Sequence, residues 1–236
     1  SDMPVKSAVF KMAIPSVVSS LVLVIYNMAD TFFVGQTNNA FQVAAVSFTN
    51  PIFVLFMAFT NLLGIGGSTA ISIFLGGKNG IEAKRASSFC CYASLLLGAI
   101  SGIIIIIFMD PILKLLGSSE NTYQFSKDYL FYIALGAPFI FFTNTFGHTV
   151  RGEGGATASM VGGTIVNIVL DPIFILTLNM GAAGAAIATV IGNIFGGLYY
   201  VYYLKVKSPS LTLSLKEFQI LGKAAKRTVT LGIPAG

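Results

Sequence analysis

Charged side chains are spaced along this chain in an unusual way. Asp, Glu, Lys and Arg are absent from five long stretches, at residues 12–29, 31–77, 86–109, 129–150 and 172–204. Only 10% of the residues are charged and the mean hydropathy is +0.81, whereas a soluble domain carries about 25% charged residues. A helix needs about 20 apolar residues to cross a bilayer. The sequence therefore predicts an all-α integral membrane protein.

The stretch from 31 to 77 is too long for one crossing, because a helix of that length would extend about 70 Å and the hydrocarbon core is ~30 Å thick. A polar run at 35–39 divides it, and a second polar run at 177–181 divides the stretch after Arg151. We therefore expect an N-terminal lobe, 1–204, with six spans at about 9–34, 43–77, 86–109, 125–150, 157–179 and 183–204. A basic cytoplasmic connector, 205–230, and the start of a seventh helix, 231–236, complete the predicted organisation.

The basic residues predict the orientation of these spans, because loops rich in Lys and Arg stay in the cytoplasm. With the N-terminus inside, the outer segments carry only Lys114 and Lys127. The inner segments carry Lys6, Lys11, Lys78, Lys84, Arg85, Arg151, Lys205, Lys207, Lys216, Lys223, Lys226 and Arg227. This topology accounts for the net charge of +5 without a nucleic-acid partner, and it makes the lipid bilayer the expected environment.

Cofactor and metal motifs are absent from the sequence. Cys90 and Cys91 are adjacent and lack the spacing of a zinc site or a disulfide framework, so we interpret them as packing residues. The single histidine, His148, lies near the inner end of the fourth span, where we expect a hydrogen-bonded interfacial residue. Phosphate-binding and dinucleotide-binding motifs are also missing. We therefore expect no cofactor and no catalytic residue.

Once the residues at the span ends are assigned to the loops, two aspartates, Asp30 and Asp171, are the only charged residues that remain within the predicted spans. A carboxylate at the centre of a membrane helix costs about 2.5–3.5 kcal/mol, so each position calls for a reason. At 1.5 Å per residue, they lie about 7 Å and about 12 Å from the outer ends of their helices, in a common layer. Each has an amide on its own helix face, Asn27 and Asn167 respectively.

This pattern favours a cation site over an aspartate that only hydrogen-bonds a neighbouring helix. Carboxylate and carboxamide oxygens can bind Na⁺, and a carboxylate can instead carry a proton. The residue types leave both chemistries open. Thr189 and Asn193 on the sixth span, and Asn144 on the fourth, are candidates to complete the cluster, although helix–helix hydrogen bonding would also explain them. Pro172 lacks an N–H and can free a backbone carbonyl beside Asp171.

Glycine and proline suggest close packing and bending. The pairs Gly98 with Gly102 and Gly192 with Gly196 are spaced to let helices approach closely. Glycine and proline also interrupt other spans, at Pro15, Pro51, Gly64, Gly66, Gly67 and Pro138. These interruptions are typical of helices that bend during transport, and tolerance of close packing would explain them equally well.

Two short segments point to an internal repeat: residues 12–16 (MAIPS) and 231–235 (LGIPA) share a pattern and would both begin a span from the inside. Longer motifs then identify a family. The segments 25–35 (IYNMADTFFVG), 151–154 (RGEG), 167–172 (NIVLDP) and 181–189 (GAAGAAIAT) resemble the multidrug and toxic compound extrusion (MATE) family, especially its bacterial DinF-like branch.

The resemblance implies one lobe of a twelve-helix, two-lobe antiporter of the bacterial inner membrane, in which small cationic or amphipathic drugs leave as Na⁺ or H⁺ enters. Asp30, Asn167, Asp171 and Thr189 match the polar cluster of the family's N-terminal lobe. Asn144 matches a fourth-helix member. Asn27 is a further predicted cation ligand, and Asn144, Asn193 and Tyr26 are predicted to line a substrate or cation path. Because the chain stops as a seventh helix begins, it resembles an N-terminal half whose C-terminal lobe is missing.

Other functions would account for part of this pattern. An intramembrane aspartyl protease would also use two membrane carboxylates. However, Asp171 follows Leu170 rather than a Gly-x-Gly segment, and paired amides suit a cation better than peptide hydrolysis. A seven-helix receptor disagrees with six spans and an inside N-terminus, and another kind of polytopic membrane protein is the remaining alternative.

Overall fold

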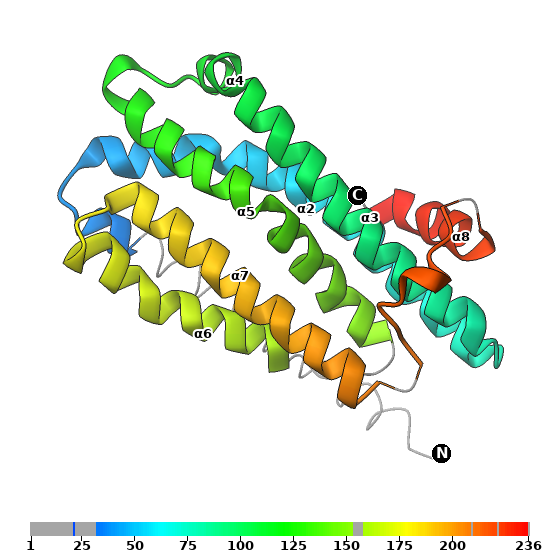
Figure 1. The fold of residues 1–236 in the computed structure, drawn as a ribbon. Helices are drawn as coiled ribbons and strands as arrows, with labels where there is room; N and C mark the ends of the chain where they lie inside the picture. Colours follow the sequence, from blue (N-terminus) through cyan, green and yellow to red (C-terminus); the bar gives the residue numbers. More distant parts are fainter. Residues whose placement is uncertain (1–20, 22–31, 153–157, 209, 221, 236) are drawn as a thin grey trace.

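The computed structural model describes residues 21, 32–152, 158–208, 210–220 and 222–235, and within these residues it contains helices and no strand. The elements are α2 (Ala40–Gly76), α3 (Gly80–Ile107), α4 (Met109–Leu115), α5 (Glu120–Gly152), α6 (Ala158–Pro172), a π-helix (Ile173–Thr177), α7 (Gly181–Val206), a 3₁₀ turn (Leu215–Glu217), α8 (Lys223–Gly232) and a final 3₁₀ turn (Ile233–Ala235). The long helices lie side by side along a common direction (Figure 1). The predicted all-α class is confirmed for this part of the chain.

Within the described residues, four helices, α2, α3, α5 and α7, are long and apolar enough to cross a membrane. The fifth predicted span is occupied by α6 and the π-helix, with a shorter apolar segment, Gly163–Thr177. Most of the first predicted span, 9–34, lies outside the described residues. Large apolar side chains such as Val54, Ile103 and Leu198 are exposed on these helices, as expected where lipid replaces water around the protein.

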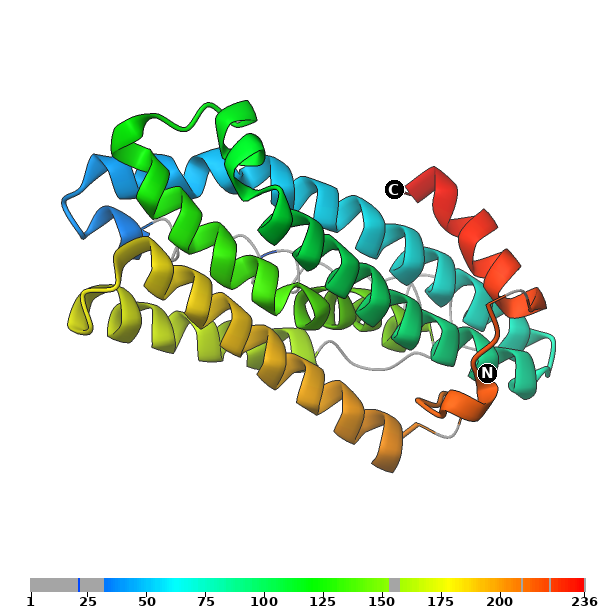
Figure 2. The same ribbon diagram turned by 45° about the horizontal axis from the view of Figure 1, so that its top comes forward.

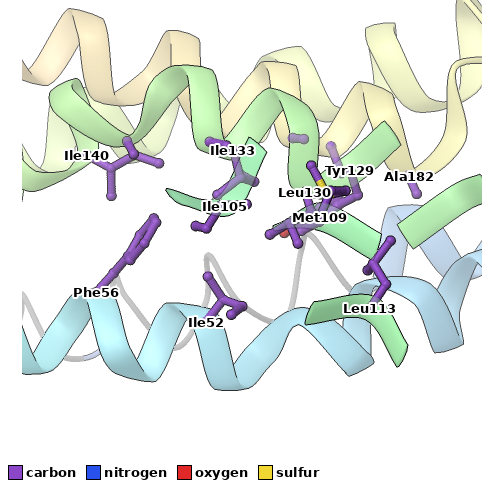
Figure 3. Close-up of a cluster of buried hydrophobic side chains, with 14 of the residues drawn as sticks. Ile52, Phe56, Ile105, Met109, Leu113, Tyr129, Leu130, Ile133, Ile140 and Ala182 are labelled. Carbon is purple, nitrogen blue, oxygen red and sulfur yellow. The ribbon is translucent and has the colours of Figure 1, made fainter. Parts of the chain in front are cut away.

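The core is built around α5, which packs against α2, α3 and α7. One cluster of buried side chains joins Ile52 and Phe56 of α2 to Leu130 and Ile133 of α5, and Figure 3 shows these side chains converging between the helices. The ring of Phe56 meets Phe141 edge to face, with 4.9 Å between centroids. Aromatic pairs of this geometry add roughly 0.5–1.5 kcal/mol to the burial of the rings.

Glycines allow α3 and α5 to approach closely, as predicted. A Cβ atom on Gly98 would lie 2.7 Å from the carbonyl oxygen of Ala137, and one on Gly102 would lie 2.3 Å from that of Ala134. Both distances are too short for a side chain. The predicted role of this glycine pair is confirmed.

The glycines of α2 are packing positions, and α2 continues through them as one α-helix from Ala40 to Gly76. A Cβ on Gly64 would lie 2.9 Å from His148 Cδ2, and one on Gly67 would lie 2.3 Å from Cys90 Sγ. Cys90 is buried and its thiol donates to the carbonyl of Leu63. Both Cys90 and its neighbour are free cysteines in the core, in agreement with the predicted packing role.

The short helix α4 closes the end of the bundle where α3 turns into α5. Asp110 on α4 accepts a hydrogen bond from the Tyr123 hydroxyl, and its Oδ1 lies 3.7 Å from Lys127 Nζ. This hydrogen bond, together with the charges of Lys127 and Lys114, holds the pKa of Asp110 below its ordinary value. The two basic residues predicted for the outer side therefore surround one exposed carboxylate.

The segment after α7, which includes residues 212–214, packs against α3 (Figure 2). Ser87 Oγ donates to the Thr212 carbonyl at 3.0 Å, Ser88 Oγ to the Ser214 carbonyl at 2.9 Å, and Tyr92 Oη to the Leu213 carbonyl at 2.8 Å. We call these three hydrogen bonds the connector clamp. They satisfy consecutive carbonyls of an extended segment that has no ladder partner.

The helix expected to start at 231 begins earlier, because α8 runs from Lys223 to Gly232. Its small buried residues, Ala224, Ala225 and Thr228, face the bundle. A Cβ on Gly66 of α2 would lie 2.1 Å from the Thr228 carbonyl oxygen, so the two backbones are in direct contact. The predicted connector 205–230 therefore contains most of a helix that packs on α2.

The clamp gives a first prediction. Replacing Ser88 with alanine and Tyr92 with phenylalanine together should loosen residues 211–218, because each lost hydrogen bond is worth about 0.5–1.5 kcal/mol. We expect amide hydrogen exchange in this segment to accelerate roughly 30-fold, at about 1.4 kcal/mol per factor of ten. The control is Ser94→Ala, since Ser94 on the same helix donates only within α3, to the Cys91 carbonyl. Equal exchange in the double variant and the control would contradict the clamp.

Candidate functional site

The sequence of α6 places a polar pair on its inner face. Asn167 and Asp171 are four residues apart, so they lie one turn apart on the same side of the helix. Both are buried, with exposed fractions of 2% and 0%, whereas Ile165 and Val169 are each 56% exposed on the outer side. The exposed apolar residues of α6 thus lie on the outer surface, and its amide and carboxylate face the bundle.

Glycines bring α7 against this polar face. A Cβ on Gly163 of α6 would lie 2.8 Å from the carbonyl oxygen of Gly192, and a Cβ on Gly192 would lie 3.1 Å from Asn167 Cβ. Gly192 and Gly196 therefore allow the close contact between helices that the sequence predicted, and Gly196 Cα also lies near Gly163. Thr189 lies about one turn before Gly192 and so reaches the level of Asn167.

Asn167 connects the two helices by hydrogen bonds. With its amide nitrogen toward α6, Nδ2 donates to Asp171 Oδ2 at 3.1 Å and the carbonyl oxygen accepts from the Thr189 backbone N–H at 3.0 Å. In the opposite amide orientation, Nδ2 donates to Thr189 Oγ1 at 3.4 Å. The surroundings favour the first orientation, because in the opposite one the amide oxygen faces only acceptors and the amide nitrogen faces only donors.

Three of the predicted ligands are therefore brought together. Asp171, Asn167 and Thr189, with exposed fractions of 0%, 2% and 4%, form what we call the polar cluster between α6 and α7. Their side chains offer a carboxylate, a carboxamide and a hydroxyl, which are oxygen donors suited to a hard cation or to a proton. Among the described residues, no group of three His, Cys, Asp or Glu side chains could hold a metal ion.

The backbone changes geometry directly after the carboxylate. α6 ends at Pro172, and residues Ile173–Thr177 form a π-helix in which the Leu178 N–H donates to the Ile173 carbonyl at 2.9 Å. Pro172 has no N–H for the carbonyl of Ile168, as the sequence predicted. The π-helix itself was not predicted, and Pro172 is the only sequence signal near it. Single π turns often mark functional positions in helices.

Asn193 and Asn144 were predicted to line a path, and Asn193 lies about one turn beyond Thr189 on α7. Asn193 Nδ2 donates to the backbone carbonyl of Thr189 on the same helix at 2.9 Å. The backbone carbonyl of Asn193 accepts a hydrogen bond from Thr143 Oγ1 of α5 at 2.8 Å. The sequence reasoning missed Thr143, since a threonine on an apolar helix carries no distinct signal. Asn144 is half-buried on α5, and no hydrogen bond within the described part of the chain joins it to Asp171.

The remaining predicted site residues, Asp30, Asn27 and Tyr26, lie outside the described residues, so their place beside the polar cluster stays a prediction.

Comparison with known proteins then decides the family. The MatE family model matches residues 15–177, which include Asn167 and Asp171. The chain belongs to the MatE family. The family predicted from the sequence motifs is confirmed.

This MatE chain is 35% identical over 237 residues to the multidrug export protein MepA of Staphylococcus haemolyticus (strain JCSC1435), an alignment that covers 98% of the chain and 52% of MepA. It also resembles the outward-facing conformation of a multidrug resistance MATE family transporter, at 31% identity and a TM-score of 0.89, over 98% of the chain and 52% of that transporter.

The inward-facing conformation of a MATE family transporter gives 31% identity and a TM-score of 0.82, over 89% of the MatE chain and 48% of that structure. The chain spans about half the length of the curated relatives it matches.

Proposed function

We propose that this chain forms the first lobe of a cation-coupled multidrug exporter of a bacterial plasma membrane, and that the polar cluster binds the coupling cation, Na⁺ or H⁺. The observation that carries the proposal is the complete burial of Asp171 against Asn167 and Thr189. A buried carboxylate is costly within a membrane and marks ion or proton pathways. The oxygen-only donor set agrees with that use.

The comparisons support the rest of the proposal. MepA is a multidrug export protein, and the alignment covers half of it, which fits a second lobe of similar size. Small cationic or amphipathic drugs are then the expected substrates. These relatives favour transport over the alternative of an intramembrane aspartyl protease. The lysine distribution supports an orientation with the N-terminus in the cytoplasm.

The mechanism follows from how the cluster is built. When a cation or proton occupies the site, the charge of Asp171 is neutralised and the cost of burying it falls, so occupation favours one packing of α6 against α7. The helix is interrupted at Pro172 and the π-helix, which gives α6 a defined place to shift. Asp30 and Asn27 would add ligands from the first span. Tyr26, Asn144 and Asn193 would line the route to the site.

The proposal is tested in cells that lack their own drug exporters. The complete exporter that carries this lobe should export ethidium against its concentration gradient, and export should stop when either a protonophore or a sodium ionophore removes the driving gradient. The empty vector is the control. Efflux no faster than this control, at matched expression in the membrane, would rule out the proposed function.

A further inference from the structure

The end of the bundle that carries the connector is rich in lysines. All are exposed: Lys78, Lys84, Lys205, Lys207, Lys216, Lys223 and Lys226. Among the described residues at this end, the acidic side chains are Glu82 and Glu217, and both lie near Arg85, at 2.7 Å and 3.6 Å. No ion pair within the described part of the chain involves the lysines of this end. Within the described residues, the positive charge of these lysines therefore has no acidic partner.

Large apolar side chains are interleaved with these lysines. Val206 lies between Lys205 and Lys207 and is 63% exposed, while Leu215 and Ile220 in the connector are 65% and 64% exposed. Alternation of lysines with exposed apolar residues is typical of segments that lie at the boundary between headgroups and acyl chains. We call Val206, Leu215 and Ile220, with Lys205, Lys207 and Lys216, the interfacial surface.

The backbone beneath this surface is already ordered. The connector clamp fixes residues 212–214 on α3, and Phe218 stacks on Phe89 with 6.4 Å between ring centroids and 13° between ring planes. Leu211 is buried in the core. A ligand that binds here therefore does not have to order the chain, which removes one of the main costs of binding.

A cavity of about 360 Å³ opens where α7 meets the connector, lined by Leu204, Lys205, Thr212, Leu213 and Ser214. The residues that line it are one lysine, one threonine, one serine and two leucines. A phosphodiester with a glycerol backbone matches this set, because the phosphate needs a cation and donors and the glycerol carbons need apolar contact. Basic pockets beside membrane helices bind anionic headgroups in this way.

We propose that the interfacial surface and this cavity form a binding site for an anionic phospholipid of the surrounding leaflet, with the phosphate at Lys205. Charge complementarity and the neighbouring apolar side chains favour a lipid over a soluble anion, since Val206, Leu215 and Ile220 would contact its acyl chains. This site lies at the opposite end of α7 from the polar cluster, so its function is distinct from cation coupling. It anchors the connector, and α8 behind it, to the membrane surface.

Native mass spectrometry of the purified protein tests this site, with phosphatidylglycerol and phosphatidylcholine titrated separately. We expect tighter binding of phosphatidylglycerol. The variant in which Lys205, Lys207 and Lys216 are all glutamine should lower that affinity on the order of 100-fold, at about one factor of five per lysine near an anionic surface. Changing the same three lysines to arginine should preserve binding, because the charge remains.

The control is Lys114→Gln with Lys127→Gln at the other end of the bundle, which should leave phosphatidylglycerol binding unchanged. Equal affinity for the two lipids, or full binding by the triple glutamine variant, would overturn the proposal. Competition by glycerol phosphate at the concentration that the lipid requires would also overturn it, because the site would then recognise a soluble anion. Hydrogen exchange of residues 211–218 verifies that each variant keeps the connector clamp.

Discussion

Gly102→Ala should destabilise the helix bundle by about 2–3 kcal/mol, although it adds a single methyl group. The new Cβ would lie 2.3 Å from the carbonyl oxygen of Ala134 and 3.6 Å from Ala137 Cβ. Backbone atoms cannot rotate away as a flexible side chain can, so α3 and α5 would have to separate. Separation would also loosen the packing of α5 against α2, because α5 is the central helix of the core.

The matched control for this change is Gly80→Ala on the same helix. Gly80 has no atom within 4 Å of the position its Cβ would occupy. The substitution there should therefore be neutral or should stabilise the protein by up to about 1 kcal/mol, through the lower entropy of the unfolded chain. Unfolding of both variants in mild detergent, followed by circular dichroism, measures the difference. Equal unfolding midpoints would show that α3 and α5 are not in backbone contact.

Asp171→Asn should abolish cation-coupled efflux while leaving the fold intact. Asparagine has nearly the same volume and can still hydrogen-bond Asn167, so the packing between α6 and α7 is kept. Asparagine carries no charge and cannot take up a proton, so neither Na⁺ nor H⁺ would be stabilised by binding at the site. Burying an ionised carboxylate within a membrane costs about 2.5–3.5 kcal/mol, and a bound cation offsets this cost. If this free energy is all that cation binding contributes, its loss should slow efflux on the order of 100-fold.

The control for this prediction is Asp110→Asn, the same exchange at an exposed carboxylate outside the polar cluster. Asp110 lies on α4 at the end of the bundle, and its side chain accepts a hydrogen bond from the Tyr123 hydroxyl, which asparagine can also accept. This exchange should leave most of the efflux. The measurement is the initial rate of ethidium efflux, divided by the amount of folded protein in the membrane. A similar loss in both variants would indicate a general packing defect in place of a specific role for Asp171.

Much of the fold could be predicted because bilayer-sized, charge-free stretches leave few arrangements. The spacing of charges identified α2, α3, α5 and α7, and the glycine pairs identified two close helix contacts. The start of α8 was missed because Lys223, Lys226 and Arg227 give it the composition of a loop. Its buried face is made of Ala224, Ala225 and Thr228, whose small side chains give little hydropathy signal.

The residues of the site could also be predicted only in part from the sequence. The four-residue spacing of Asn167 and Asp171 was enough to place them on one face of a helix. The partner on α7 depended on the family resemblance, because Thr189 and Asn193 are both polar and sit on the same helix. The structure distinguishes the two residues by their partners. Thr189 hydrogen-bonds Asn167 of α6, whereas the Asn193 side chain donates to a backbone carbonyl of its own helix. Long-range pairings such as Ser88 with Ser214 have no local pattern that would reveal them.

We propose that Asp171 couples drug export to a cation gradient. The most direct measurement is ethidium efflux from proteoliposomes that contain the complete exporter, with a sodium gradient and a proton gradient imposed in separate experiments. We predict that one gradient drives efflux by the unaltered protein and that neither drives efflux by Asp171→Asn. Gradient-driven efflux that persists at the unaltered rate in Asp171→Asn would contradict this account.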